Sequence, residues 1–286
     1  MDALSLPVIV RDLEQAYIRQ VTTLRTPFRD YVEHLQRTLA SDRMRYWKGY
    51  LANVEPCLMP GDMPLKHSTS EYNAQYAWVI LPAAATAPIA EMCRGKGLTR
   101  SAFLHMTWSL VLAYFTGKRQ VYFGYISSGR DYPIDGIGEI VGPLINMLVA
   151  RVDLGQPLPT TMENINSYHI EHLENQHVSL ADLQHETSTK QLFNTNITVR
   201  EARRRSTVVD GGMQLVELLE EDRHEYDIVL AATINNADTE VSIQYRTDFV
   251  SLENAQDIQD ALRSAIDFLG STQNSYGPSG AAALSG

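Results

Sequence analysis

Two neighbouring stretches decide the fold class of this chain. They are Val-Tyr-Phe-Gly-Tyr-Ile-Ser-Ser-Gly-Arg-Asp (121–131) and Val-Gly-Pro-Leu-Ile-Asn-Met-Leu-Val-Ala-Arg (141–151). The first is rich in β-branched and aromatic residues and ends in a polar turn, which predicts a buried strand over 121–126. The second opens with a Gly-Pro turn and runs into apolar residues, which predicts a strand over 144–152 that contains one amide, Asn146.

Hydrophobic periodicity outside these stretches predicts interleaved helices and strands. Apolar residues recur every three or four positions in the predicted helices and run continuously in the predicted strands. The predicted helices lie within 7–52 (three segments) and at 87–96, 101–116, 161–174 and 252–269, and the predicted strands at 77–81, 192–199, 213–219, 226–234 and 241–245. Interleaving of this kind indicates an α/β (α+β sandwich) fold with a mixed sheet flanked by helices.

Three details of this pattern can be checked in a structure. An apolar stripe in helix 101–116 predicts a core-facing side made of Phe103, Leu104, Trp108, Val111 and Tyr114. Helix 161–174 is expected to face the core with Ile165, Tyr168 and Leu173. The Asn-Asn-Ala-Asp run 235–238 predicts a hairpin loop between the last two strands.

Composition excludes several classes of protein. The chain has 286 residues, 44% of them apolar, and a formal net charge of −10, so binding to a nucleic-acid backbone is not expected. No apolar run reaches the ~20 residues of a membrane helix, and the first residues do not resemble a signal peptide. The two cysteines, Cys57 and Cys93, form no metal or redox motif, which favours a reducing, cytoplasmic location.

Local catalytic signatures are few. The run Gly136-x-Gly138-x-x-x-Gly142 has one residue too many for a dinucleotide loop, and the serines at 127–128 do not fit a nucleophile elbow. His169 and His172 lie three residues apart on a predicted helix. We interpret them as part of a polar helix surface, with metal binding as the alternative.

Several motifs in one order resemble the condensation domains of nonribosomal peptide synthetases, fungal ones in particular. The family has "FG…SGR" and "VGPFINTLPLR" motifs where this chain has 121–131 and 141–151. Further similarity covers the stretches 98–112, 174–180, 193–197, 226–230 and 245–249. The resemblance spans about residues 2–269 and implies a lobe of the chloramphenicol-acetyltransferase type. The Ser-Gly-Arg turn and the Val-Gly-Pro run favour condensation over the related epimerisation domains.

The first residues resemble the end of the family's catalytic motif. Fungal members often continue His-His-x-x-x-Asp-Gly into a Ser-Leu-Pro…Arg-Asp-Leu stretch, and this chain has Ser5-Leu6-Pro7 and Arg11-Asp12-Leu13. Aligned in this way, Asp2 is the motif's aspartate, a residue with a structural role that pairs with an arginine in the family. The resemblance therefore implies that both histidines and the first lobe precede residue 1. Residues 1–269 are expected to be a partial condensation domain (helical connection plus C-terminal lobe), and residues 270–286 a flexible tail or linker.

The resemblance also implies a set of site residues. The residues expected along the substrate tunnel are Tyr125, Ser127, Ser128, Gly129, Arg130, Asn146 and Met147. Arg130 either contacts substrate or holds the lobe together through a salt bridge. The amide of Asn146 either binds backbone or faces the tunnel. No catalytic residue is assigned within this chain, and neither a metal nor a directly bound cofactor is expected.

The family joins an amine acceptor to an acyl thioester, each carried on the phosphopantetheine arm of a carrier domain. The resemblance thus implies carrier (thiolation) domains and the other lobe as partners, and an inactive chain when alone. Basic residues that could meet an acidic carrier are Arg43, Arg45, Lys48, Arg203 and Arg204. Two alternatives stay open: a non-catalytic carrier-binding or interaction module, and an acyltransferase of the same fold.

Overall fold

The computed structural model describes most of the chain. The described residues are 1–19, 24–37, 40–63, 75–186, 191–202, 226–235 and 238–271. Within them, no helix is both long and apolar enough to cross a bilayer.

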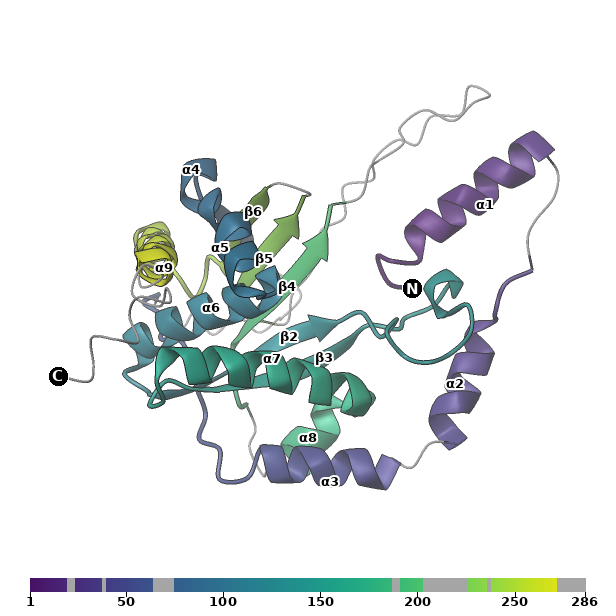
Figure 1. Ribbon diagram of the computed structural model, residues 1–286, viewed down its shortest axis with the longest axis horizontal. Coiled ribbons are helices and arrows are strands. Elements are labelled where there is room, and N and C mark those ends of the chain that lie inside the picture. Colours follow the sequence, from purple (N-terminus) through teal and green to yellow (C-terminus); the bar gives the residue numbers. More distant parts are fainter. Residues whose placement is uncertain are drawn as a thin grey trace.

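A six-stranded mixed sheet forms the centre of the described structure (Figure 1). The strand order is β1-β6-β5-β4-β2-β3. Strand β4 runs parallel to both β2 and β5, and the other neighbouring strands pair antiparallel. The strands are β1 (Tyr76–Ile80), β2 (Gln120–Ser127), β3 (Asn146–Asp153), β4 (Thr195–Glu201), β5 (Ile228–Ile234) and β6 (Thr239–Arg246).

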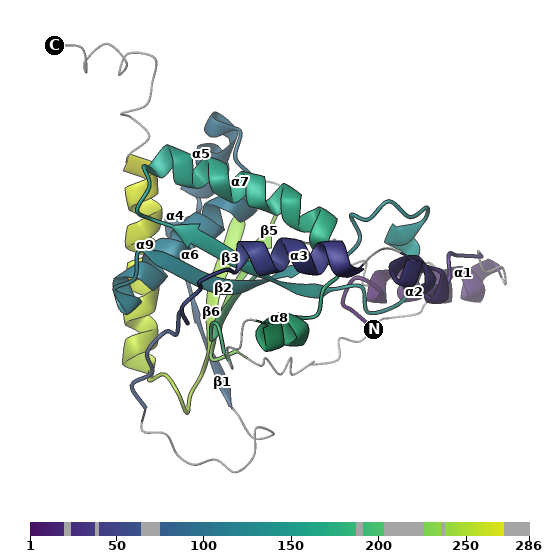
Figure 2. The ribbon, with the colours of Figure 1, turned by 90° about the horizontal axis from the view of Figure 1, so that it is seen from below.

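Helices cover one face of this sheet. The long helix α6 packs between α7 and α9, all three pack against strands, and α5 lies beside α6 (Figures 1 and 2). Because side chains alternate along a strand, Phe123 and Tyr125 of β2 point to this layer. The helices on and around the sheet are α3 (Ala40–Tyr50), α4 (Ala83–Thr86), α5 (Pro88–Lys96), α6 (Arg100–Thr116), α7 (Leu158–Asn175), α8 (Leu180–Glu186) and α9 (Leu252–Ser271).

Local signals explain where α6 begins and ends. Its N-cap is Thr99, whose hydroxyl accepts a hydrogen bond from the amide of Ala102. It ends at Gly117, which adopts a left-handed conformation with φ of 68°. The buried side of α6 includes Phe103 and Trp108, both at most 1% exposed, so the helix fills the centre of the main core.

The N-terminal helices extend to one side of the sheet (Figure 1). They are α1 (Leu6–Arg19) and α2 (Phe28–Arg37). Helix α2 packs its buried Tyr31 against the connection between β2 and β3, where Ile140 and Leu144 form a second, smaller apolar cluster. This connection includes the 3-10 helix η2 (Ile137–Glu139). The cluster fixes the connection in place against α2.

Three of the sequence motifs meet at the sheet. Arg246, at the end of β6, contacts Asp227 at 3.0 Å and Asp248 at 2.8 Å. Asp227 in turn accepts a hydrogen bond from Asn194, which precedes β4. The motifs at 193–197, 226–230 and 245–249 are therefore held together by one polar network.

Most predicted elements are confirmed, and so is the α/β class with a mixed sheet. The hairpin at 235–238 is confirmed because Ile234 pairs with Thr239 and the amide of Asn235 donates a hydrogen bond to the carbonyl of Asp238. The strand predicted at 144–152 begins instead at Asn146, since the amide of Leu144 donates to a side chain and not to β2. The predicted strand 213–219 lies outside the described residues.

Two core assignments were wrong, and two short helices were not predicted. Tyr114 and Leu173 are 76% and 38% exposed, because each lies at the margin of its helix's apolar stripe. The unpredicted helices α4 and α8 have only four and seven residues, too short for a clear helical period.

Candidate functional site

Asp2 is the centre of a buried cluster of hydrogen-bonded polar groups. We call this cluster, made of Asp2, Ser5, Arg130 and the amide of Leu144, the polar knot. Its carboxylate accepts hydrogen bonds from the hydroxyl of Ser5 (2.7 Å), the amide of Leu144 (3.1 Å) and Nη2 of Arg130 (2.9 Å). The Asp2 side chain is fully buried, and that of Arg130 is only 10% exposed. This knot joins the first residues of the chain to both ends of the β2–β3 connection.

The knot keeps Asp2 ionised. Burial alone would raise its pKa, but the hydrogen bonds from Ser5, Leu144 and Arg130 together hold the pKa below its usual value. Arg130 also donates to the backbone carbonyls of Ile137 and Ile140, at 3.1 and 2.9 Å. Of the two alternatives for Arg130, the structure shows the salt bridge that holds the lobe together.

Gly129 allows the turn after β2 to approach the knot. Its φ is +67°, and a Cβ at this position would lie 1.9 Å from the carbonyl oxygen of Leu144. Only glycine fits this combination of backbone conformation and close approach. The turn is therefore fixed by sterics on one side and by Arg130 on the other.

Gln176 fixes the ends of β2 and β3 to the end of α7. Ser127 and Asn146 are paired across the two strands. The hydroxyl of Ser127 donates to Oε1 of the fully buried Gln176 at 2.6 Å, and the amide of Asn146 donates to the backbone carbonyls of Gln176 and Val178. Asn146 thus binds backbone, which is the first of its two alternatives. Gln176 lies within the motif 174–180, and the role of its side chain was not predicted.

A hollow of about 650 Å³ lies between α6, α7 and the ends of β2 and β4. It extends from Thr99, Arg100 and Ser101 at the start of α6 to Ser127 and Ser128 after β2. Because Gly129 and Arg130 follow directly, the hollow ends beside the Asp2 knot. Its other lining residues are His105, Tyr125, Ile126, Asp131, Leu148, His169, Leu173, Ile197, Val199, Arg200, Glu201 and Ile234.

The predicted tunnel residues divide between these places. Tyr125, Ser127 and Ser128 line the hollow. Gly129 and Arg130 belong to the knot. Met147 is half-buried on the face of the sheet away from the hollow, where its sulfur packs near Gly124. The hollow residues His105 and Arg100 were not predicted. For His105, the available signal was a polar residue within the apolar stripe of α6.

The histidines of α7 are not part of a polar surface, contrary to the sequence interpretation. His172 is fully buried between Trp47, Tyr50 and Tyr125, and its Nδ1 lies 2.6 Å from the Tyr125 hydroxyl. His169 Nε2 lies 3.3 Å from Nδ1 of His105. The described residues contain no group of three potential metal ligands of the His, Cys, Asp or Glu type. The aromatic residues that bury these rings come from other elements, so periodicity along α7 could not reveal them.

Burial keeps these histidines neutral. It lowers the pKa of His169 to about 4 and that of His172 to about 3, and the pKa of His105 lies well below its usual value. Burial also raises the pKa of Tyr168, whose hydroxyl lies 2.6 Å from His105 Nδ1. We therefore assign the Tyr168 hydroxyl as the donor and His105 as the acceptor.

The proposed carrier-docking residues lie in three different situations. Arg43 is buried, and its guanidinium donates to the carbonyl of His177, so it is not available on a docking surface. Arg45 is 78% exposed and pairs with Asp42, and Lys48 is exposed on the same helix. Arg203 and Arg204 lie outside the described residues.

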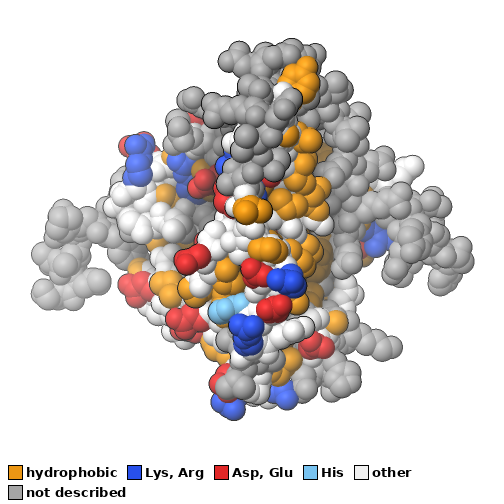
Figure 3. Space-filling view, turned by 90° about the vertical axis from the view of Figure 1, so that its right-hand side faces the viewer, with side chains coloured by type: hydrophobic (Ala, Val, Ile, Leu, Met, Phe, Trp, Pro, Cys, Tyr) orange, Lys and Arg blue, Asp and Glu red, His pale blue; other side chains and the backbone are white. Residues whose placement is uncertain are grey.

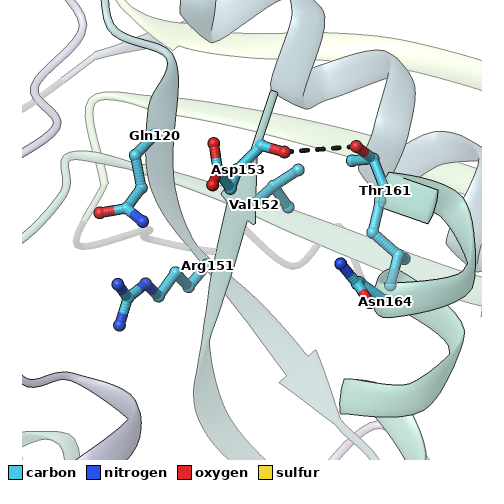
Figure 4. Close-up of a pocket in the computed structure, with 7 residues that line it drawn as sticks. Gln120, Arg151, Val152, Asp153, Thr161 and Asn164 are labelled. Carbon is cyan, nitrogen blue, oxygen red and sulfur yellow. Dashed lines mark hydrogen bonds between the residues drawn. The ribbon is translucent and has the colours of Figure 1, made fainter. Parts of the chain in front are cut away.

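A smaller cavity of about 210 Å³ lies between β3 and the start of α7 (Figure 4). Its polar groups serve the fold. Nη1 of Arg151 donates to the carbonyl of Tyr50 at 2.6 Å, and the hydroxyl of Thr161 donates to that of Asp153 at 3.3 Å. The cavity lies at the end of β3 opposite Asn146. We therefore take the larger hollow and the adjacent knot as the candidate site.

The fold is shared with solved structures from a nonribosomal peptide synthetase and a polyketide synthase. The structure matches a holo four-domain nonribosomal peptide synthetase, AB3403, bound to AMP and glycine (TM-score 0.76, 12% identity, 95% of this chain and 23% of that one). It also matches the condensation domain from Monacolin K polyketide synthase MokA (TM-score 0.72, 16% identity, 94% and 67% of the two chains). These likenesses confirm the fold class.

The sequence shows the family. Residues 1–274 match the family model of the Condensation domain, and the chain belongs to this family. Nonribosomal peptide synthetase 8 of Aspergillus fumigatus is 32% identical over 277 residues, which cover 94% of this chain and 3% of that protein. The chain thus spans only a small part of the length of such relatives. The resemblance drawn from the motifs is confirmed.

Proposed function

We propose that this chain forms the acceptor-side lobe of a condensation domain in a nonribosomal peptide synthetase. In this reaction the acceptor amine attacks the carbonyl of the donor thioester. A C–N bond forms, the C–S bond breaks, the amine loses a proton and the donor arm leaves as a thiol. Because α9 continues to Ser271 and not only to 269, residues 1–271 are proposed to carry this part of the domain, with the residues after 271 as a linker.

The observation that carries the proposal is the course of the hollow. It begins at the first turn of α6 and ends at the turn that Gly129 and Arg130 hold against Asp2. In the family the residue that matches Asp2 is the next-to-last residue of the catalytic motif, so the motif ends directly after it. An arm that fills this hollow would therefore bring its tip to the place where the motif ends, and positioning of two tethered groups can supply much of the catalysis.

The chain's own residues would position the arm and leave proton transfer to another group. No histidine here stands in a His-His-x-x-x-Asp-Gly context. Asp2 is committed to four donor groups and is fully buried, so it holds the turn and does not act as a base. We therefore propose carrier domains and the other lobe as partners, and no condensation by this chain alone.

An apolar surface supports the proposed second lobe. Helix α1 exposes Leu6, Leu13 and Tyr17, at 47%, 55% and 62%, and the turn before β3 exposes Val141 and Ile145, at 38% and 48%. Hydrophobic side chains form a band on this side of the molecule (Figure 3). An apolar surface of this kind commonly marks an interface.

Site-directed alkylation tests the hollow as the arm's site. At each position we compare the rate of alkylation by bromoacetyl-pantetheine with the rate of alkylation by bromoacetamide. This ratio should be higher for the variant Ser101→Cys than for Asn164→Cys. Ser101 lines the hollow, and Asn164 lines the smaller cavity. The natural cysteines give little background because both are buried and burial raises their pKa, to about 11 for Cys93. Equal relative rates at the two positions would contradict the proposal.

The alternative, a non-catalytic carrier-binding module, rests on the exposed basic side chains of α3. Charge reversal of Arg45 and Lys48 should then weaken binding of a carrier domain and reduce its dependence on salt. Unchanged binding would remove this alternative. Condensation of carrier-bound substrates by the purified chain would instead favour a self-sufficient acyltransferase.

A further inference from the structure

Burial and charge change together along the hollow. Arg200, Glu201 and Asp131 are exposed and, with the half-buried Arg100 at the start of α6, form a charged rim. Deeper residues such as Leu148 and Ile197 are each 1% exposed. A group that enters from the rim therefore leaves a charged, hydrated region for an apolar one.

The inner wall holds polar rings but no ionised group. His105 is 1% exposed, and its Nδ1 accepts from the hydroxyl of Tyr168. Tyr125 is 8% exposed and is bonded to His172. Because burial lowers the pKa of His105 and raises that of Tyr125, both rings are neutral near pH 7. The inner wall therefore offers aromatic and aliphatic surface without a counter-charge.

We propose that the inner part of the hollow is a subsite for the side chain of the acceptor aminoacyl group, and that it selects an uncharged, apolar side chain. This inference rests on the proposed function, in which the hollow receives the acceptor arm. The subsite is defined by His105, Tyr125, Leu148, Ile197 and the neighbouring His169.

The selectivity follows from desolvation. An apolar side chain gains by leaving water for this surface, whereas an ammonium or carboxylate would lose its hydration without a partner charge. The charged residues that line the hollow, Arg100, Arg200, Asp131 and Glu201, are two of each sign, so together they favour neither a positive nor a negative side chain. A charged side chain should therefore bind roughly tenfold or more weakly than an apolar one of the same length.

Matched small probes test the inference on the purified chain. One probe is pantetheine itself. The other three are hydrolysis-stable norleucyl, lysyl and glutamyl amides of aminopantetheine, and these three share the same α-amine. Binding would be followed by calorimetry and by NMR shifts of the hollow residues. Norleucyl is expected to bind most tightly, since it has nearly the shape of lysyl without its charge.

The outcomes separate the two proposals. If pantetheine itself does not bind at the hollow, the proposed function fails and the subsite fails with it. If pantetheine binds but the three aminoacyl probes bind equally well, or no better than pantetheine, only the subsite is refuted. Preference for the norleucyl probe supports it.

A charge placed on the wall provides a second test. Leu173 lines the hollow and is 38% exposed, so Leu173→Asp should fold. It should raise the affinity for the lysyl probe relative to norleucyl. Ile170→Asp is the matched control, because Ile170 lies on the same helix, is 66% exposed and does not line the hollow. The same relative change in both variants would overturn the subsite.

Discussion

Asp2→Asn tests whether the buried knot holds the β2–β3 connection in place. The substitution keeps the shape of the side chain but removes the negative charge beside Arg130, whose side chain is 10% exposed. Loss of one partner from a buried ion pair costs about 3–5 kcal/mol. Arg130 keeps its three backbone carbonyl acceptors, so we expect the lower end, about 3 kcal/mol.

Hydrogen exchange would locate this cost. The amide of Leu144 donates to Asp2, and that of Gly142 donates to Ser5 Oγ. If the knot opens locally, exchange at these two amides should accelerate roughly a hundredfold, since each ~1.4 kcal/mol is a factor of ten. Amides in the sheet, such as that of Leu230, should change much less.

An exposed ion pair provides the matched control. Arg45 and Asp42 are 78% and 59% exposed, so Arg45→Met should cost at most about 1 kcal/mol. In a double-mutant cycle, Arg130→Met should cost less in the Asp2→Asn background than in the wild type. Additive effects, or Leu144 exchange that is unchanged in Asp2→Asn, would show that the knot does not stabilise the connection.

Three further predictions follow from single positions. Gly129→Ala should destabilise the β2–β3 connection by more than about 2 kcal/mol, because its Cβ would clash with backbone and its φ is positive. Gly138→Ala should be nearly neutral, because its Cβ would meet open space. Urea denaturation of the two variants compares these effects. Between pH 6.5 and about 3, His172 takes up a proton only in the unfolded chain. The free energy of unfolding should therefore fall as the pH is lowered, by up to about 1.4 kcal/mol per pH unit for this one residue. The variant His172→Phe should reduce that slope in urea titrations repeated across this pH range. Gly95→Ala should raise the thermal midpoint, since a helical glycine with open space around it gains about 0.5–1 kcal/mol as alanine; an unchanged or lower midpoint would contradict this.

The sequence predicted the elements better than their surroundings. Helix α6 was predicted within one residue because its apolar stripe is a local signal, and the structure adds the Thr99 cap at one end and Gly117 at the other. The burial of His172 was not predicted, because Trp47 and Tyr50, which enclose it, come from a helix more than a hundred residues earlier. The burial of Arg43 was missed for the same reason, since its acceptor is the carbonyl of His177.

Residue order by itself determined the family, the class of fold and the pairing expected for Asp2. Motif spacing, helix caps and hydrophobic period are properties of neighbours along the chain, and such properties can be read without coordinates. The tertiary structure alone decided that Arg130 and Asn146 hold backbone in place, and that neutral rings from α6, α7 and β2 meet in one hollow. The physical reason is that burial and pKa depend on which distant elements exclude water from a side chain, and that exclusion exists only once the sheet and its helices have packed.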